Sequence, residues 1–583
     1  MEFDELLKSL GEFGFYQFRV VTISCVAMLT ITTHFMCQVF YTLPVAHWCR
    51  VPGWDNCSTY WNRTEEDCDK EMLSAAIPLK YDKDNATTVY SQCSRFDVII
   101  RESNDSRHEM IGDTSDTISC DDGWVYHTTD DQTSLITDFD LVCSRESLAE
   151  ITYTIFFGGI LFSCAIAGLI GDRIGRRTTF FVGSGISGTF GVLAAFSPTV
   201  WFYASCRFMI GFGQWLLTSG IIVIASEIVG PSWRVVMSVV IWTTASFGYI
   251  AVAGLAYVTS SWRHLQIVIS LPYLMVLLFI TIVPESPRWL LSRGRVKDAE
   301  KTLQKIASVN KKSLPLNFMM DWKIEEVSNE EKNQTFFRLF LVPGLRWRIL
   351  NIMFNWFVLS LVYYGLSLNS TDMGVNAYLA FCLIGVVEMG ACILAMPSLN
   401  ILGRRLTLFG TMLPGGFACI AAIFIPPGPW KITLAMAGKF CVTLSFTSMY
   451  IVTVENFPTP MRAAGLGFGS LCSRTGGMLC PTVLLLGNFW EPLPLLIFGS
   501  SGLIAGFLAM FLPETRGKSM PQTVHEAVAL GRQQQAATDT RPRHRVMKLK
   551  KKLECMLAAN ISVCHLRFST NRLVVFRNPR LNN

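Results

Sequence analysis

Repeated apolar segments of about 20 residues limit the fold of this chain more than any other feature of its sequence. A helix needs that length to cross a hydrocarbon core roughly 30 Å thick, and residues 265–283 and 349–368 are clear examples. Only 16% of the 583 residues are charged, against about 25% in an ordinary soluble domain. The pattern predicts an all-α membrane protein with many spans.

Twelve transmembrane helices are predicted, and an even number places both termini on the same side of the membrane. The first apolar run follows the acidic residues Glu2, Asp4 and Glu5 and is longer than the core of a secretion signal, so we expect it to be retained. The predicted spans lie near residues 20–45, 151–170, 178–197, 201–229, 235–258, 265–283, 349–368, 376–399, 406–425, 431–454, 463–487 and 493–512.

The first two spans are separated by a polar segment, residues 46–150, that is far longer than an ordinary loop. Its cysteines and Asn-x-Ser/Thr acceptors are typical of an oxidising compartment, which predicts an extracellular, glycosylated domain with three disulfides. The pairing stays open, and a zinc site is disfavoured because no Cys-x-x-Cys sequence is present. The residues concerned are Cys49, Cys57, Cys68, Cys93, Cys120 and Cys143, with acceptors at Asn56, Asn62, Asn85 and Asn104.

Short motifs recur at nearly one spacing, which indicates an internal repeat. The sequence Gly-Arg-Arg ending at Arg177 returns at Arg405, 228 residues later, and Glu227 returns as Glu455 at the same offset. A Pro-Glu pair also follows the sixth and the twelfth span. Two duplicated six-helix halves are the parallel repeat of the major facilitator architecture.

The repeat and the predicted spans divide the chain into parts. We expect both termini and residues 284–348 in the cytoplasm, which agrees with the basic loop after span two because short basic loops face inward. The predicted parts are a cytoplasmic start at 1–19, a first half at 20–283 that includes 46–150, a linker at 284–348, a second half at 349–512 and a basic tail at 513–583.

Charged residues at the inner ends of the spans are candidate gating residues. Paired charges there could form ion pairs that close the inner mouth in one state and break in another; the alternative is a static surface pair. The expected pairs are Glu227 with Arg234 and Glu455 with Arg462. The loop motifs supply the remaining candidates: Asp172, Arg173, Arg176, Arg177, Arg404 and Arg405.

Three charged residues lie inside predicted spans of the second half: Glu388, Lys439 and Arg474. Such residues are rare, because a charge in the bilayer needs a wet cavity, a partner or a ligand. The alternative to a substrate site is a permanent pair, Glu388 with either Arg474 or Lys439, and Lys439 could also extend towards the interface. Aromatic residues in these spans could stack on a ligand or hold a cation, or could simply pack in lipid or core: Trp242, Trp356, Tyr363, Tyr364 and Phe446.

At these residues the chain resembles the organic ion transporter family, solute carrier family twenty-two, nearly throughout residues 1–520. The resemblance implies that Trp242, Trp356, Tyr363, Glu388, Phe446, Ser473 and Arg474 lie at cavity positions, and that an Arg rather than an Asp in span eleven is typical of anion and carnitine carriers. It rests on Phe3-Asp-Glu-Leu-Leu, Cys120-Asp-Asp-Gly-Trp-Val-Tyr, Thr137-Asp-Phe-Asp-Leu-Val-Cys143, Pro284-Glu-Ser-Pro-Arg-Trp-Leu290, Glu455-Asn-Phe-Pro-Thr-Pro-Met-Arg462 and Pro513-Glu-Thr515.

The sequence therefore predicts a plasma-membrane carrier that moves small organic ions by alternating access, with a preference for anions or zwitterions such as carnitine-like carboxylates. The alternatives are an organic cation carrier that uses Glu388 and the aromatic residues, and a receptor-like membrane protein without turnover. Exchange or coupling to Na⁺ or H⁺ stays open. We expect no enzyme activity, cofactor, metal site or nucleic-acid partner, and we expect the basic residues 541–552 to contact anionic lipid or solvent.

Overall fold

The structure is a computed structural model of the chain. It describes residues 3–52, 65–82, 87–102, 108–127, 132–312, 340–369, 375–458, 461–518, 520–521 and 523–529.

The first half contains six long helices, of which the second to the sixth follow one another with short connections. Glycine ends α6 and begins α7, so the chain reverses without an intervening loop. The helices are α2 (Phe15–Tyr41), α6 (Ser147–Ile174), α7 (Arg176–Ala195), α8 (Val200–Ile228), α9 (Arg234–Val258) and α10 (Trp262–Val276), which continues as the 3-10 turn Leu277–Thr281.

The second half repeats this order. Its helices are α14 (Arg346–Leu368), α15 (Ala377–Leu402), α16 (Arg404–Ala421), α17 (Pro429–Asn456), α18 (Arg462–Leu485) and α19 (Leu493–Ala509). In the described part of the chain, ten helices are long and apolar enough to cross a membrane, and α19 is a shorter apolar helix. With α18, which occupies the place of the eleventh predicted span, these make the twelve helices of the predicted fold class, which is thereby confirmed. The span ends lie mostly within a few residues of those predicted.

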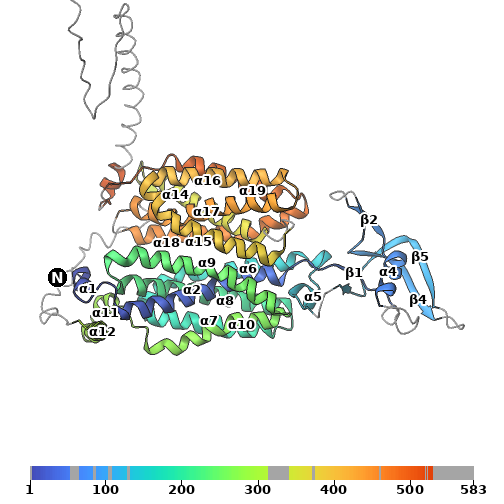
Figure 1. The fold of residues 1–583 in the computed structure, drawn as a ribbon, viewed down its shortest axis with the longest axis horizontal. Coiled ribbons are helices and arrows are strands. Elements are labelled where there is room, and N and C mark those ends of the chain that lie inside the picture. Colours follow the sequence, from blue (N-terminus) through green and yellow to red (C-terminus); the bar gives the residue numbers. More distant parts are fainter. Residues whose placement is uncertain are drawn as a thin grey trace, which may run out of the picture.

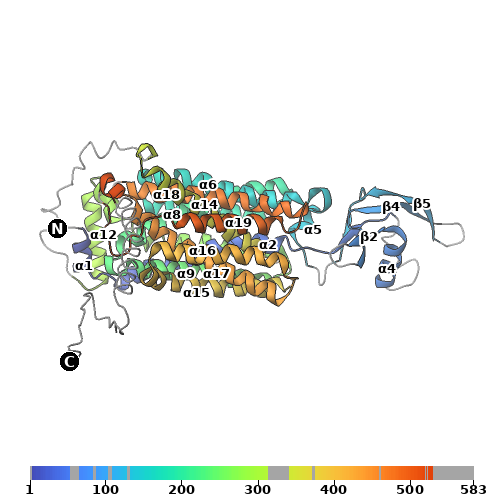
Figure 2. The same ribbon diagram turned by 90° about the horizontal axis from the view of Figure 1, so that it is seen from above.

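The two halves lie side by side with their helices nearly parallel (Figure 1). In Figure 1 α7, α8 and α10 form one side of the bundle and α14, α16 and α19 the other, while the helices of the two halves meet between them. The view from above shows the same elongated bundle with a small domain projecting from one end (Figure 2).

The projecting part is formed by the predicted loop segment, which we call the loop domain (residues 46–150). Its described residues contain α4 (Glu65–Ala76), α5 (Leu135–Phe139) and three two-stranded antiparallel sheets. These pair β1 (His47–Cys49) with β6 (Trp124–Tyr126), β2 (Leu79–Asp82) with β3 (Thr87–Tyr90), and β4 (Ser94–Glu102) with β5 (His108–Ser119).

Two disulfides stabilise the loop domain. Cys49 pairs with Cys120 across the β1–β6 end, and Cys93 pairs with Cys143 next to the start of α6. The second bond ties the domain to the membrane bundle, because Cys143 begins the 3-10 turn Cys143–Arg145 that leads into that helix. Of the remaining predicted sites, Cys57 and the acceptors Asn56, Asn62, Asn85 and Asn104 lie outside the described residues, so the third disulfide and the glycosylation stay predictions.

The end of the bundle opposite the loop domain, which we call the motif end, carries short helices: α1 (Phe3–Ser9), α11 (Pro287–Ser292) and α12 (Val296–Val309). Asp4 on α1 forms ion pairs with Arg234, at 2.7 Å, and with Arg288. The hydrogen bond from Arg234, with the charges of both arginines, holds the pKa of the Asp4 carboxyl below its ordinary value, although partial burial opposes this. These contacts fasten the start of the chain to the first half.

Replacing Cys93 by Ser is expected to loosen the junction between the loop domain and α6. The bond closes a loop of 50 residues, and chain entropy predicts a stabilisation of about 4 kcal/mol for such a loop. Limited proteolysis of intact cells should therefore cleave the Cys93→Ser loop domain faster than the wild type. Cys472→Ser, which removes a free and half-buried thiol, is the matched control. Equal cleavage of both variants would contradict the prediction.

Candidate functional site

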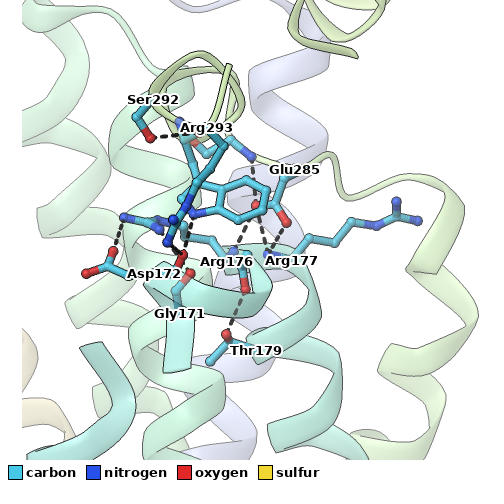
Figure 3. Close-up of polar contacts among 11 residues, drawn as sticks. Gly171, Asp172, Arg176, Arg177, Thr179, Glu285, Ser292 and Arg293 are labelled. Atoms are coloured by element: carbon cyan, nitrogen blue, oxygen red, sulfur yellow. Dashed lines mark hydrogen bonds and ion pairs between the residues drawn. The ribbon is translucent and has the colours of Figure 1, made fainter. Parts of the chain in front are cut away.

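The loop between α6 and α7 is held by a carboxylate from a distant part of the chain (Figure 3). Glu285, in the predicted Pro-Glu motif, accepts hydrogen bonds from the backbone N–H groups of Arg176, at 2.9 Å, and Arg177, at 3.1 Å. The first N–H groups of a helix have no partner within it, and a negative charge there is also favoured by the helix dipole. Glu285 therefore caps α7 and connects two of the repeated motifs.

The second half repeats this contact. Glu514 accepts from the backbone N–H groups of Arg404, at 3.0 Å, and Arg405, at 3.1 Å. The glycine before each helix has a positive φ, 97° at Gly175 and 88° at Gly403. A Cβ at Gly175 would lie 2.2 Å from Glu285 Oε2, so the turn requires glycine both for its backbone angle and for the approach of the carboxylate.

The ion pairs at the motif end differ between the halves. Arg176 pairs with Asp172 at 2.8 Å, whereas the equivalent Arg404 pairs with Glu455 at 2.6 Å. The residue equivalent to Asp172 is Asn400, which cannot form an ion pair, so Arg404 bonds to the glutamate of α17 instead. The missing acid in the second loop motif thus has a direct structural consequence.

Neither predicted inner-mouth pair, Glu227 with Arg234 or Glu455 with Arg462, is formed in this conformation. Arg234 contacts Asp4 rather than Glu227, and Glu455 contacts Arg404 rather than Arg462. Arg404 comes close to Glu455 because α16 begins beside the end of α17, while α1 folds back and places Asp4 next to Arg234. Glu227 Oε2 is buried without a hydrogen-bond partner among the described residues. Arg173 is exposed.

Glu388 and Lys439 form a buried ion pair inside the second half. Lys439 Nζ lies 2.8 Å from Glu388 Oε1, and only 1% of the lysine and 3% of the glutamate are exposed. The ammonium also donates to Ser367 Oγ at 2.7 Å and to the carbonyl oxygen of Tyr363 at 3.1 Å. Of the alternatives left open by the sequence, the structure contains the Glu388–Lys439 pair, and the idea that Lys439 extends to the interface is wrong.

Arg474 is buried without a carboxylate partner among the described residues. Its guanidinium donates to the hydroxyl of Tyr364 at 3.1 Å and lies 4.3 Å from the centre of the Trp215 ring. Its Nε has no hydrogen-bond partner among the described residues. The neighbouring Ser473 hydroxyl is also buried without such a partner. A charged donor with unfilled positions in a protected site can accept an anionic ligand.

The predicted aromatic residues form one continuous cluster. Trp356 contacts Phe446 with ring centres 5.7 Å apart, and Phe446 contacts Tyr363 at 5.5 Å. Tyr363 packs against Tyr364 at 5.2 Å, which links the cluster to Arg474. Trp242, from the first half, joins through Tyr450. The structure therefore brings together, by direct contact, all of the predicted binding residues except Ser473.

The halves meet through rings and hydroxyl groups at this level of the bundle. Tyr249 on α9 forms a hydrogen bond of 3.1 Å between its hydroxyl and that of Tyr363 on α14. Phe35 on α2 stacks on Tyr364 with ring centres 6.0 Å apart. The contact of Trp215 with Arg474 also joins the two halves.

Sequence reasoning did not identify Trp215, Tyr249 and Tyr450 as members of the site. Aromatic residues are common in membrane spans, so only their contacts separate these three from the rest.

Sequence reasoning also did not select Arg207, which is fully buried and whose guanidinium lies 4.3 Å from the centre of the Phe156 ring. Its guanidinium donates to the carbonyl of His34 at 3.3 Å, and no carboxylate contacts it within the described part of the chain. In the described residues no group of three or more potential metal ligands was found.

Comparison with known proteins identifies clear relatives. The family described as "Sugar (and other) transporter" matches residues 89–525. The organic cation transporter protein of Drosophila melanogaster is 36% identical, covering 91% of this chain and 95% of the relative. Human solute carrier family 22 member 13 is 35% identical over 90% of the chain and 93% of the relative, and human organic anion transporter 3 is 32% identical over the same shares.

Solved structures show the same fold. The xylose transporter XylE from E. coli, in a partially occluded inward-open conformation, superposes with a TM-score of 0.56. The match covers 86% of this chain and 99% of XylE at 16% identity. At that identity the likeness concerns the fold alone.

Replacing Glu514 by Gln should lower the stability of the second half by about 1 kcal/mol, because a neutral amide is a weaker cap for the α16 N-terminus. The repeat leads us to expect a similar effect of Glu285→Gln on the first half. Thermal unfolding of the purified protein checks both variants, and Glu300→Gln on α12 serves as control. Loss of stability in one variant alone would mean that the two caps are not equivalent.

Replacing Lys439 by Met is expected to leave Glu388 buried with an uncompensated charge, at a cost of about 3–5 kcal/mol. The double variant Lys439→Met with Glu388→Gln removes both charges and should recover most of that loss. Thermal unfolding and the amount of folded protein in detergent measure the effect. A double variant as unstable as Lys439→Met alone would show that the lysine stabilises the bundle through its other hydrogen bonds instead.

Proposed function

The chain belongs to the organic ion transporters of solute carrier family 22, within the major facilitator class, and we propose that it carries small organic anions and zwitterions across the plasma membrane by alternating access. Its membrane helices and its fold make it a multi-pass membrane protein. Family and fold indicate a transporter rather than an enzyme.

The charge of the central site is the observation that carries the anion preference. Glu388 is already neutralised by Lys439 at 2.8 Å, so this pair adds no net charge to the site. The positive charge of Arg474 is not compensated by a carboxylate among the described residues, because its described contacts are a phenol hydroxyl and an aromatic ring. In a protected site a guanidinium attracts a carboxylate and repels a free cation. The fixed charge at the centre is therefore positive.

The aromatic cluster supports a substrate with an apolar or ring-containing part. Trp356, Phe446 and Tyr450 contact one another through ring faces and edges, and Phe446 also contacts Tyr363. Such rings also attract a quaternary ammonium group by its interaction with π-electrons. A molecule that carries a carboxylate at one end and a cationic or aromatic group at the other fits both features.

The motif end is proposed to lie in the cytoplasm and to form the inner gate. The disulfides and the predicted glycosylation acceptors of the loop domain support an extracellular position for that domain, which leaves the motif end inside. The capped turns and the Arg404–Glu455 pair stabilise the inner ends of α7, α16 and α17. Alternating access requires contacts of this kind to differ between two states.

A cation carrier is the second candidate, because the relative from Drosophila melanogaster that is 36% identical is named as an organic cation transporter. In that case Glu388 would have to exchange Lys439 for the ammonium group of the substrate. The two candidates differ in the expected role of Arg474.

Uptake by cells that express the protein tests the choice. We expect saturable uptake of carboxylates and zwitterions, a loss of at least tenfold in uptake with Arg474→Ala, and a partial loss with Arg474→Lys, which keeps the charge but not the planar donor group. Arg19→Ala, at an exposed position on α2, is the control. Saturable uptake of cations alone, unaffected by Arg474→Ala, would support the second candidate and overturn the proposal.

A further inference from the structure

A cavity of about 700 Å³ lies between the two halves at the loop-domain end of the bundle. Its lining comes from α2 and α6 of the first half, from α14, α17, α18 and α19 of the second half, and from the loop domain. None of the predicted binding residues lines it. It is therefore a separate space from the cluster around Arg474.

The cavity contains a buried cation without a partner. Lys431, in the first turn of α17, lines the cavity and is only 8% exposed. Among the described residues its ammonium forms no hydrogen bond and no ion pair, although buried ammonium groups are normally paired. A lysine in this condition that lines a cavity of about 700 Å³ is placed to receive an anionic group.

Carboxylates from both halves line the same cavity. Glu146 and Glu150 belong to the start of α6, and Glu491 precedes α19. The lining therefore offers one ammonium group and three carboxylates, so a bare anion meets repulsion while a molecule with both charges can satisfy both kinds of group.

Aromatic rings separate this cavity from Arg474. Tyr153 lines the cavity and contacts Phe157, with ring centres 5.1 Å apart. Phe157 contacts Tyr364 at 4.8 Å, and Tyr364 accepts the hydrogen bond from Arg474. Tyr153, Phe157 and Tyr364 thus form a continuous series of ring contacts from the cavity lining to Arg474.

We propose that this cavity is an outer binding site for zwitterions, in which Lys431 receives the carboxylate and the glutamates receive the cationic group before the substrate passes to Arg474. The inference rests on the proposed transport function. It assigns charge selection to two successive steps, with zwitterions favoured over dianions at the outer site.

Transport from the two sides of the membrane tests the outer site. Lys431→Gln should raise the KM for external zwitterion about fivefold and leave the maximal rate of uptake and the KM for internal substrate unchanged, because internal substrate reaches this cavity only after it has been translocated. Lys431→Arg should restore most of the affinity. An unchanged external KM, or an equal rise on both sides, would overturn the proposal.

Glu491→Gln supplies a second test at a position that is exposed. It should raise the external KM for a betaine, which carries a trimethylammonium group, more than the KM for a simple monocarboxylate of similar size. An equal change for both compounds, or none, would argue against the role of the glutamates and contradict the zwitterion assignment.

Binding to purified protein separates failure of the outer site from failure of the proposed function. In the Arg474→Ala variant, a betaine at millimolar concentration should still raise the unfolding temperature of the protein. The double variant Arg474→Ala with Lys431→Gln should lose that effect. If wild-type cells show no saturable uptake but this pattern holds, the transport proposal fails and the site remains. If betaine has no effect in the Arg474→Ala background, the outer site is absent.

Discussion

A charge inside a membrane protein has to be compensated within the protein, and the central architecture of this chain follows from how it meets that requirement. The charges of Glu388 on α15 and Lys439 on α17 compensate each other, and this buried ion pair joins two helices of one half. Arg474 and Arg207 have no carboxylate partner in the described part of the chain and are surrounded by rings, hydroxyl groups and backbone carbonyls. The first arrangement is a neutral pair, whereas the two arginines carry positive charges that no carboxylate of the described residues compensates.

At the motif end the two halves share the contact that caps a helix and differ in the ion pair beside it. In each half a glutamate that follows the sixth helix caps the third, which locks the reversal after the second helix. The arginine that begins the capped helix forms an ion pair with a different acidic residue in each half, Asp172 in the first and Glu455 in the second. One substitution between the repeats, Asp172 against Asn400, therefore redirects a salt bridge from its own turn to another helix.

The spans, the repeat and the loop domain could be predicted because apolar length, motif spacing and cysteine content are local properties of the sequence. Charge partners could not. Asp4 and Arg234 are 230 residues apart, and their contact depends on how α1 folds back onto the bundle. Likewise Trp215 looks like any other aromatic residue of a span until its distance to Arg474 is known. Residue type indicated which groups needed partners, but only packing decides which partners they take.

The contacts that join the halves near the centre are mainly ring contacts and one hydrogen bond between tyrosines. The ion pairs Arg176–Asp172, Arg404–Glu455 and Glu388–Lys439, in contrast, each lie within one half. Apolar contacts weaken on cooling, and salt screens them little. In the proposed alternating access, the movement of one half against the other should therefore depend strongly on temperature and weakly on ionic strength. By this reasoning the apolar interface lets the two halves shift against each other without breaking ion pairs, while the ion pairs inside each half keep that half rigid.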